Sequence, residues 1–266
     1  RMINSNLDMN ITKYVCVDWK ALVDVIDALG GLDLDLTKEE VHWVNGYITE
    51  TANSIGYPCD ALKGEGRVHL NGVQAVSYSR IRYTSGDDFL RASRQRIVLQ
   101  AILEKCKGED IATLTSMCSS MMDDISTNFT VKEILALAKN VTKYQISSTT
   151  GFPYNVATKE LSGVGDTVIP IDLATDVVQL HKYLFEDESY TVSDTVQSIS
   201  DTVQKKTDVD SKTDIYDTTK YNNTAGSTGT EGAKKKNKDA QDALKKSQSE
   251  SENDSTTKSS SDDSDD

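Results

Sequence analysis

The chain has 266 residues, of which 37% are hydrophobic, and it carries a formal net charge of −13 at pH 7. This acidic excess argues against general nucleic-acid binding, because neutralising phosphates requires more Lys and Arg than Asp and Glu, so we expect no nucleic-acid partner. The hydrophobic content is low for a fully packed globule of this length, which indicates that part of the chain is unfolded. No stretch approaches the roughly 20 consecutive apolar residues of a membrane span.

The first predicted elements are a strand, a helix and a second strand. Residues 14–17 are a short run rich in β-branched and aromatic side chains, and they lead to Asp18, which suits a helix N-cap. Apolar residues then follow at helical spacing until Gly30 and Gly31, which tolerate the positive φ found where helices end. Residues 32–36 alternate Leu with Asp, as in a half-exposed strand. We interpret this order as a β-α-β unit of a layered α/β domain.

Cap signals predict three further helices. Thr37 is followed three positions later by Glu40, which is the spacing of a capping box, and Asn71 with Gln74 repeats this spacing at the start of a short helix. Residues 87–107 form a longer predicted helix, because its first two residues are Asp and can cap it.

The second half of that long helix, residues 97–103, is apolar on all sides, which is typical of a helix buried in the centre of a domain. Further helices are predicted near residues 111–122 and 131–141, a strand at 144–149, and a short strand at 168–170 followed by a helix from Asp172.

The apolar pattern decays beyond residue 190, and the end of the chain is rich in Ser, Thr, Asp, Lys and Glu. Such a segment cannot bury enough apolar surface to offset the entropy lost on ordering. We therefore predict one domain over residues 1–200 and a disordered tail over residues 201–266. The tail is most simply a spacer, and a basic docking site at residues 234–236 is the alternative.

Arginine is concentrated in one short part of the chain. Five of the seven arginines lie between Arg80 and Arg96, and none follows them. Arginine offers a planar fork of donors that binds two phosphate oxygens at once, which lysine cannot do. Asp88, Arg91 and Gln95 are spaced i, i+3, i+7 and therefore share one face of the predicted long helix.

Two interpretations of the arginine cluster are open. Asp88 could form a structural ion pair with Arg91 or Arg82, or the cluster could bind an anionic ligand. Five arginines against Asp87 and Asp88 leave an excess of positive charge, and this favours the ligand.

The sequence gives little support for a zinc site or a redox site. The histidines have no metal-ligand spacing, so no zinc site is expected, and the cysteines have no CxxC spacing. Cys106 and Cys118 are either two buried thiols or a disulfide across a helix hairpin.

Segments around these arginines resemble the LytR-CpsA-Psr family. Residues 70–75 read LNGVQA, residues 78–82 read YSRIR and residues 86–95 read GDDFLRASRQ. They look like the family's LNGxQAL helix, its YxRxR pair and its GDFxRxxRQ helix. Upstream, residues 14–19 (YVCVDW) and 25–31 (VIDALGG) resemble the family's YVxVDF and VDxLGG segments. With the closing part, the resemblance covers roughly the first 200 residues.

The resemblance implies a layered α-β-α sandwich, N-terminally incomplete in this chain, that holds a polyprenyl pyrophosphate with arginines and its lipid in an apolar tunnel. Carried over by position, Arg80, Arg82, Arg91 and Gln95 would contact the pyrophosphate. Asp88 would orient the arginines. Arg80, Arg82 and Asp88 are thus the expected catalytic residues.

The sequence departs from the family pattern in two minor ways and one major way. Asp87 is an additional residue before the matching Asp88, and Trp19 stands where the family often has Phe. Trp19, Trp43 and Tyr47 are core or rim aromatics, or they line the lipid tunnel. The family's DSRxDT and PRDT-like segments, which supply carboxylates for Mg²⁺, have no counterpart here. We therefore expect an upstream part, with the Mg²⁺ ligands and a membrane anchor, to be missing, and the metal ligands of this chain are unknown.

The function implied by the resemblance is that of a phosphotransferase in cell-wall assembly. It would attach a polyprenyl-pyrophosphate-linked glycopolymer, of the teichoic acid or capsule type, to peptidoglycan on the extracellular face of the membrane of a Gram-positive-type bacterium. The alternative is a non-catalytic protein that binds lipid pyrophosphate or cell wall as an attenuator or scaffold. Because half of the site is expected elsewhere, this chain alone should bind weakly and turn over poorly.

Overall fold

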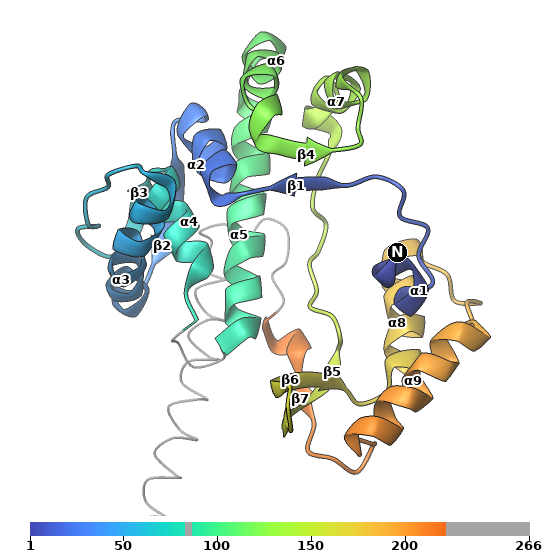
Figure 1. The fold of residues 1–266 in the computed structure, drawn as a ribbon. Helices are drawn as coiled ribbons and strands as arrows, with labels where there is room; N and C mark the ends of the chain where they lie inside the picture. The colour runs from blue at the N-terminus through green and yellow to red at the C-terminus, as the bar shows by residue number, and fades with distance from the viewer. Residues whose placement is uncertain (83–86, 222–266) are drawn as a thin grey trace, which may run out of the picture.

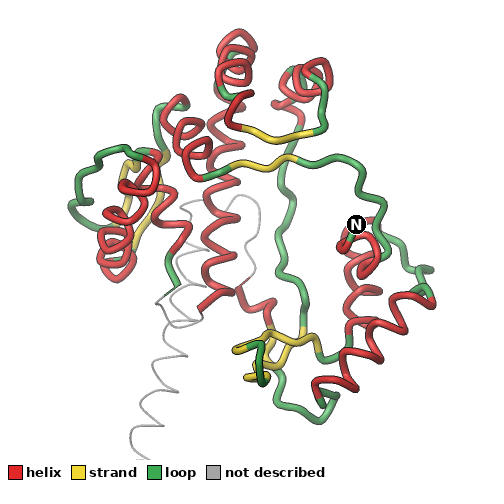
Figure 2. Tube along the Cα trace, in the orientation of Figure 1, coloured by secondary structure: helices red, strands yellow, loops and turns green. Residues whose placement is uncertain are grey.

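The computed structural model describes residues 1–82 and 87–221, and the chain has the mixed α/β fold that the sequence predicts (Figures 1 and 2). The side chains of residues 87, 88, 123, 220 and 221 are not among the described groups. The helices are α1 (Met2–Leu7), α2 (Trp19–Ala28), α3 (Lys38–Ile55), α4 (Gly72–Arg80), α5 (Asp87–Gly108), α6 (Ile111–Ser120), α7 (Val131–Ala138), α8 (Leu173–Phe185) and α9 (Asp194–Thr207). Short 3₁₀ helices are η1 (Met122–Asp124), η2 (Val141–Lys143) and η3 (Thr218–Tyr221). The strands are β1 (Val15–Val17), β2 (Leu32–Leu36), β3 (Gly66–Leu70), β4 (Ile125–Thr127), β5 (Asn155–Leu161), β6 (Gly165–Pro170) and β7 (Tyr216–Asp217).

The described strands form three small antiparallel sheets. β1 pairs with β4, β2 pairs with β3, and β5 lies between β6 and β7. The prediction that β1, α2 and β2 form one β-α-β unit is therefore wrong, since the two strands belong to different sheets. A hydrophobic pattern identifies a strand but not its partner, and β3, for which no strand was predicted, takes the place beside β2.

The largest hydrophobic core lies around the antiparallel pair of β2 and β3. Helices α2, α3 and α4 gather beside this two-stranded sheet and α5 passes along it (Figure 1). Within β2, Leu32, Leu34 and Leu36 are buried while the intervening aspartates are partly exposed, which confirms the predicted alternation. Each buried leucine removes an apolar side chain from water, worth about 1.5–3 kcal/mol before the entropic cost of ordering the chain.

The predicted caps of α2, α3 and α4 are confirmed, whereas the cap predicted at Asp87 and Asp88 depends on side chains outside the described residues. The Asp18 side chain accepts a hydrogen bond from the backbone N–H of Ala21, and the capping boxes of α3 and α4 are both complete. α4 also sits very close to α2, because a Cβ added at Gly72 would collide with the backbone of Val23. The Gly72 N–H donates to Asp27 at 2.6 Å. These contacts fix the position of α4, whose last residue is Arg80.

α5 is the longest described helix and ends close to the predicted residue 107. Val98 and Ala101 are buried against the main core, but Leu99 is 57% exposed. The prediction that residues 97–103 are buried on all sides is therefore wrong. An apolar side chain can remain exposed, because a folded protein does not cover all of its apolar surface.

The C-terminal half of the described chain departs furthest from the prediction. The strand predicted at 144–149 is not formed, and most of these residues lie in a connecting segment. β5 and β6 form a hairpin, of which only residues 168–170 were predicted as a strand. α9, capped by Ser193, runs across the predicted domain boundary at residue 200. β7 and η3 follow it to residue 221, and the rest of the predicted tail, 222–266, lies outside the described residues.

None of the helices described in 1–82 and 87–221 is both long and apolar enough to cross a membrane. All four cysteines are free thiols, and Cys106 and Cys118 are partly buried. Burial raises the pKa of both of these thiols.

Candidate functional site

Arg80 is the last residue of α4, and its side chain is only 14% exposed. Its Nη1 donates a hydrogen bond to Thr51 Oγ1 at 2.7 Å, and its Nη2 donates to Glu50 Oε1 at 2.7 Å. Both partners lie on α3, which packs against α4. The guanidinium is therefore held in one orientation by two neighbouring residues of a single helix.

Two aromatic rings flank the same guanidinium. The Cζ atom of Arg80 lies 3.7 Å from the ring centroid of Trp19 and 5.5 Å from that of Tyr47. A cation over an aromatic face is attracted by the ring quadrupole. Trp19 lies at the start of α2 and is 42% exposed, so it is not a buried core residue. Because it contacts Arg80, it is not an isolated surface residue either. Trp43 instead packs on the main core, with His42 at its edge.

The other predicted ligand-binding residues lie after Arg80 in the loop and on α5. Arg82 is exposed, Arg91 is partly buried and Gln95 is exposed. Arg91 and Gln95 are four residues apart on α5 and therefore share one face of it. Arg82 and Arg91 both interact with neighbouring groups. The Asp88 side chain lies outside the described residues, so its predicted role in orienting the arginines stays a prediction.

Arg94 connects α5 to the end of α4. Its side chain is 4% exposed, its Nε donates to Glu40 Oε1 at 3.2 Å, and its Nη1 donates to the Ile81 carbonyl at 3.4 Å. Ile81 is the C-cap residue of α4 and lies between Arg80 and Arg82. This contact places the first turns of α5 beside the end of α4, next to Arg80 and Arg82.

Burial dominates the electrostatics around Arg94. The Tyr78 ring lies 5.9 Å from the guanidinium carbon, and burial raises the pKa of Tyr78 far above its usual range, as does the charge of Glu40. The buried Arg94–Glu40 pair is thus a structural element rather than part of an open anion site.

The predicted charge excess of the arginine cluster was overstated. Arg80 and Arg94 have carboxylate partners on α3, namely Glu50 and Glu40, in addition to the two aspartates that the sequence analysis counted. These partners are 30 and 54 residues away along the chain, so no local spacing rule could have identified them.

The described part of the chain contains no set of side chains that could bind the expected Mg²⁺. No group of three or more His, Cys, Asp or Glu side chains there is arranged to hold a metal ion. Hard divalent cations need several oxygen ligands at once. The described residues therefore do not fit Mg²⁺ by themselves.

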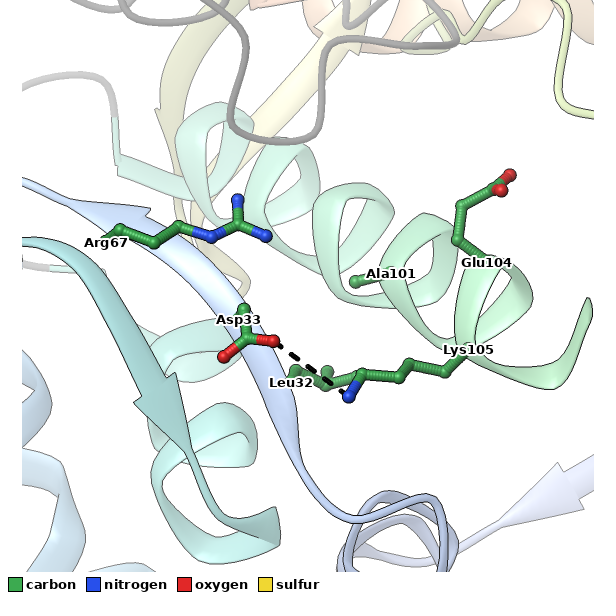
Figure 3. A pocket seen from close by; sticks show the side chains of 6 residues that line it. All are labelled: Leu32, Asp33, Arg67, Ala101, Glu104 and Lys105. Carbon is green, nitrogen blue, oxygen red and sulfur yellow. Dashed lines mark ion pairs between the residues drawn. The ribbon is translucent and has the colours of Figure 1, made fainter. Parts of the chain in front are cut away.

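A separate cavity of about 200 Å³ lies between the β2–β3 sheet and the second half of α5 (Figure 3). It is lined by Leu32, Asp33, Arg67, Ala101, Glu104 and Lys105. Asp33 lies between the two cations in Figure 3, 3.9 Å from Lys105, while Arg67 pairs with Asp35 at 3.6 Å. None of the predicted ligand-binding residues lines this cavity.

The charged side chains around the cavity form ion pairs with side chains of opposite charge. His69 Nδ1 lies 2.9 Å from Asp33 Oδ1, and this hydrogen bond lowers the pKa of Asp33. Glu104 in turn pairs with Lys107. A cavity with such balanced charges indicates no particular ligand.

The sequence pattern that defines the LytR_cpsA_psr family matches residues 1–177 of the chain. Two curated relatives are similar over about half of the chain. The polyisoprenyl-teichoic acid–peptidoglycan teichoic acid transferase TagV of Bacillus subtilis is 28% identical over 137 residues, which are 51% of this chain and 33% of the relative. The enzyme of the same description called TagU, of Bacillus mycoides, is 30% identical over 138 residues, which are 50% of this chain and 40% of the relative. The chain spans less than half the length of these relatives.

Solved structures share the fold. A protein of Enterococcus faecalis described as a transcriptional regulator superposes with a TM-score of 0.52 at 18% identity, over 77% of this chain and 69% of that chain. Protein gbs0355 of Streptococcus agalactiae superposes with a TM-score of 0.52 at 25% identity, over 72% of this chain and 63% of that chain.

Proposed function

Because the chain belongs to the LytR_cpsA_psr family, we propose that it is the arginine-bearing part of a transferase that attaches a polyprenyl-pyrophosphate-linked glycopolymer to peptidoglycan. The curated relatives are named as teichoic acid transferases, which supports teichoic acid or a similar polymer as the transferred group. The observation that carries the proposal is the guanidinium of Arg80, fixed between Trp19 and α3 at the end of the motif helix.

The proposed chemistry is a phosphoryl transfer. A peptidoglycan hydroxyl forms a bond to the phosphorus that carries the glycopolymer, and its proton is released to water. The bond from that phosphorus to the bridging oxygen breaks, and polyprenyl phosphate leaves with the negative charge. Such reactions depend on positioning the phosphates and on neutralising the charge that develops.

The arginines of this chain supply both requirements in the proposal. Arg80 can bind two phosphate oxygens with its planar fork, and the exposed Arg82 follows it two residues later. Arg91 and Gln95 add a second cation and an amide from one face of α5. Asp88 is proposed to orient the arginines. Mg²⁺, with ligands in another part of the protein, would add charge neutralisation.

We place the protein on the extracellular face of the cell membrane of a Gram-positive-type bacterium, where lipid-linked glycopolymer and peptidoglycan meet. A membrane anchor is part of this proposal. The relatives' names, which pair teichoic acid with peptidoglycan, support a site in the cell envelope.

A second candidate uses the same arginines without transfer. The matched segments are 33% and 40% of the relatives' lengths, so this chain shares only part of the sequence of the named transferases. In this role the protein would hold lipid pyrophosphate or cell wall as an attenuator or scaffold.

A paired assay separates the two candidates. The chain is given a radiolabelled polyprenyl-pyrophosphate glycopolymer with peptidoglycan and Mg²⁺, and both bound lipid and label on peptidoglycan are measured. We expect binding without transfer by this chain, and transfer when the full-length protein is used. Binding without transfer by the full-length protein would favour the scaffold role, and absence of binding by either would contradict both candidates.

A further inference from the structure

Three groups hold the guanidinium of Arg80, and they differ strongly in their freedom to move. Thr51 is fully buried, at 0% exposure, and its hydroxyl also receives a hydrogen bond from Ser77. Trp19 packs its ring against the guanidinium face. Glu50, in contrast, has a side chain that is 62% exposed.

We infer that Glu50 is a displaceable counter-ion of Arg80, and that its carboxylate competes with an anionic ligand for this guanidinium. This inference rests on the proposed pyrophosphate site at Arg80. Glu50 Oε1 takes the Nη2 donor in the structure described here, at 2.7 Å. Nη2 carries two N–H groups and Glu50 accepts from one of them, so a phosphate that reaches both terminal nitrogens from this side competes with the carboxylate.

Because Glu50 is exposed, little free energy is needed to displace its carboxylate from Arg80. Water solvates the Glu50 carboxylate well once it leaves, because this side of the ion pair is 62% exposed, although Arg80 is only 14% exposed. A pyrophosphate carries more than one negative charge and binds through a bidentate pair, so it can replace a single exposed carboxylate. Thr51 and Trp19 remain in place and keep the guanidinium plane oriented during the exchange.

Glu50 opposes the binding of anions at Arg80 even after it has been displaced. Its carboxylate, on the last turns of α3, still lies beside the bound anion, and like charges at short distance repel. Removing this charge should therefore strengthen the binding of a phosphate ligand.

The test compares the affinity of inorganic pyrophosphate and of a short polyprenyl pyrophosphate for the wild-type chain and for Glu50→Gln, by calorimetric titration. We expect Glu50→Gln to bind both ligands about threefold or more tightly, on the scale of an exposed ion pair. Glu65→Gln, in the exposed loop before β3, is the matched control with the same charge change and should leave both affinities unchanged. Glu50→Asp, whose shorter carboxylate reaches Arg80 less well, should fall between wild type and Glu50→Gln.

A second readout follows the guanidinium itself. Trp19 and Trp43 are the two tryptophans of the chain, and Trp19 is stacked on Arg80, so pyrophosphate binding should change the emission of Trp19 in a Trp43→Phe background. Glu50→Gln should shift the midpoint of this change to lower ligand concentration. A purely structural role of Glu50 would lower stability without moving that midpoint downward.

The outcomes separate this inference from the proposed function. Tighter binding of inorganic pyrophosphate by Glu50→Gln, with no binding of the lipid by either protein, supports the counter-ion and contradicts the proposed function. Lipid binding that is equal or weaker in Glu50→Gln overturns the counter-ion and leaves the proposed function standing. If inorganic pyrophosphate binds neither protein at millimolar concentration, no anion displaces Glu50 and the inference is overturned.

Discussion

Arg94 of α5 and Glu40 of α3 form an ion pair with both side chains at most 5% exposed, joined at 3.2 Å between Nε and Oε1. The other carboxylate oxygen of Glu40 accepts a hydrogen bond from the backbone N–H of Thr37 and so caps α3. One glutamate thus completes a helix N-terminus and neutralises a buried arginine. Through Ile81, the same arginine reaches the end of α4.

Breaking this pair should destabilise the fold severely. Arg94→Met leaves the Glu40 carboxylate buried without its counter-charge, and the loss of one partner of a buried pair typically costs about 3–5 kcal/mol. Urea denaturation measures the change, with Arg67→Met as the control at an arginine whose side chain is 57% exposed. A loss no larger than that of the control would show that the pair contributes little.

Gly72 should not tolerate any side chain, whereas Gly46 should tolerate one. Gly72→Ala places a Cβ against the Val23 backbone and should cost about 1–3 kcal/mol of stability through overpacking. Gly46, within α3, has open space around the position of a Cβ, so Gly46→Ala should stabilise the helix by about 1 kcal/mol. Thermal or urea unfolding of both variants checks this contrast. Equal effects would show that the close contact between α2 and α4 is not a constraint on the fold.

Trp19→Ala should weaken ligand binding at Arg80 with little effect on stability. The variant removes the ring that lies 3.7 Å from the guanidinium, and a cation–π contact of about 0.5–2 kcal/mol corresponds to about 2- to 30-fold in affinity. Trp19→Phe should retain part of the effect. Tyr14→Ala, at a similarly exposed aromatic residue, is the control. Unchanged affinity of Trp19→Ala for pyrophosphate would refute a positioning role of this ring.

Stability should decrease as pH rises from about 4 to 7 because of Asp176. This residue of α8 is 2% exposed, burial raises its pKa to about 7, and its Oδ2 atom has no hydrogen-bond partner among the residues described. The folded state then holds a proton that the unfolded state has already released, so its contribution is fully present below the unfolded pKa of 3.8 and is lost as pH approaches the folded value.

Asp176→Asn removes that titration and should flatten the pH dependence of stability over this window, a difference on the order of a few kcal/mol at neutral pH. Asp166→Asn, at an exposed aspartate of β6, is the matched control and should leave the slope unchanged. Urea denaturation at pH 4.5, 6 and 7.5 gives the comparison. Parallel curves for wild type and Asp176→Asn would contradict the role of the buried carboxyl.

The features that were predicted correctly from the sequence depend on short-range chemistry. The caps at Asp18, Thr37 and Asn71 act within three or four residues, so the sequence identified where α2, α3 and α4 begin. The alternation in residues 32–36 likewise identified β2 and its buried face.

The features that were missed depend on long-range partners. β3 follows a glycine-bearing loop and shows little apolar pattern, and its strand conformation depends on pairing with β2. Glu40 and Glu50 could not be connected to their arginines, since only the packing of α3 against its neighbours joins them. Trp19 was left open between a core role and a lipid-lining role, and its contact with Arg80 follows from the placement of α2 beside α4.

Calorimetric titration of a short polyprenyl pyrophosphate into the chain, with Mg²⁺ present, tests the central claim most directly. The measurement compares wild type with Arg80→Ala/Arg82→Ala, and uses Arg67→Ala as the control arginine outside the proposed site. We predict that wild type and Arg67→Ala bind the lipid and that the double variant does not. Equal binding by all three folded proteins, or no binding by the folded wild-type chain, would contradict the assignment of Arg80 and Arg82 to the pyrophosphate.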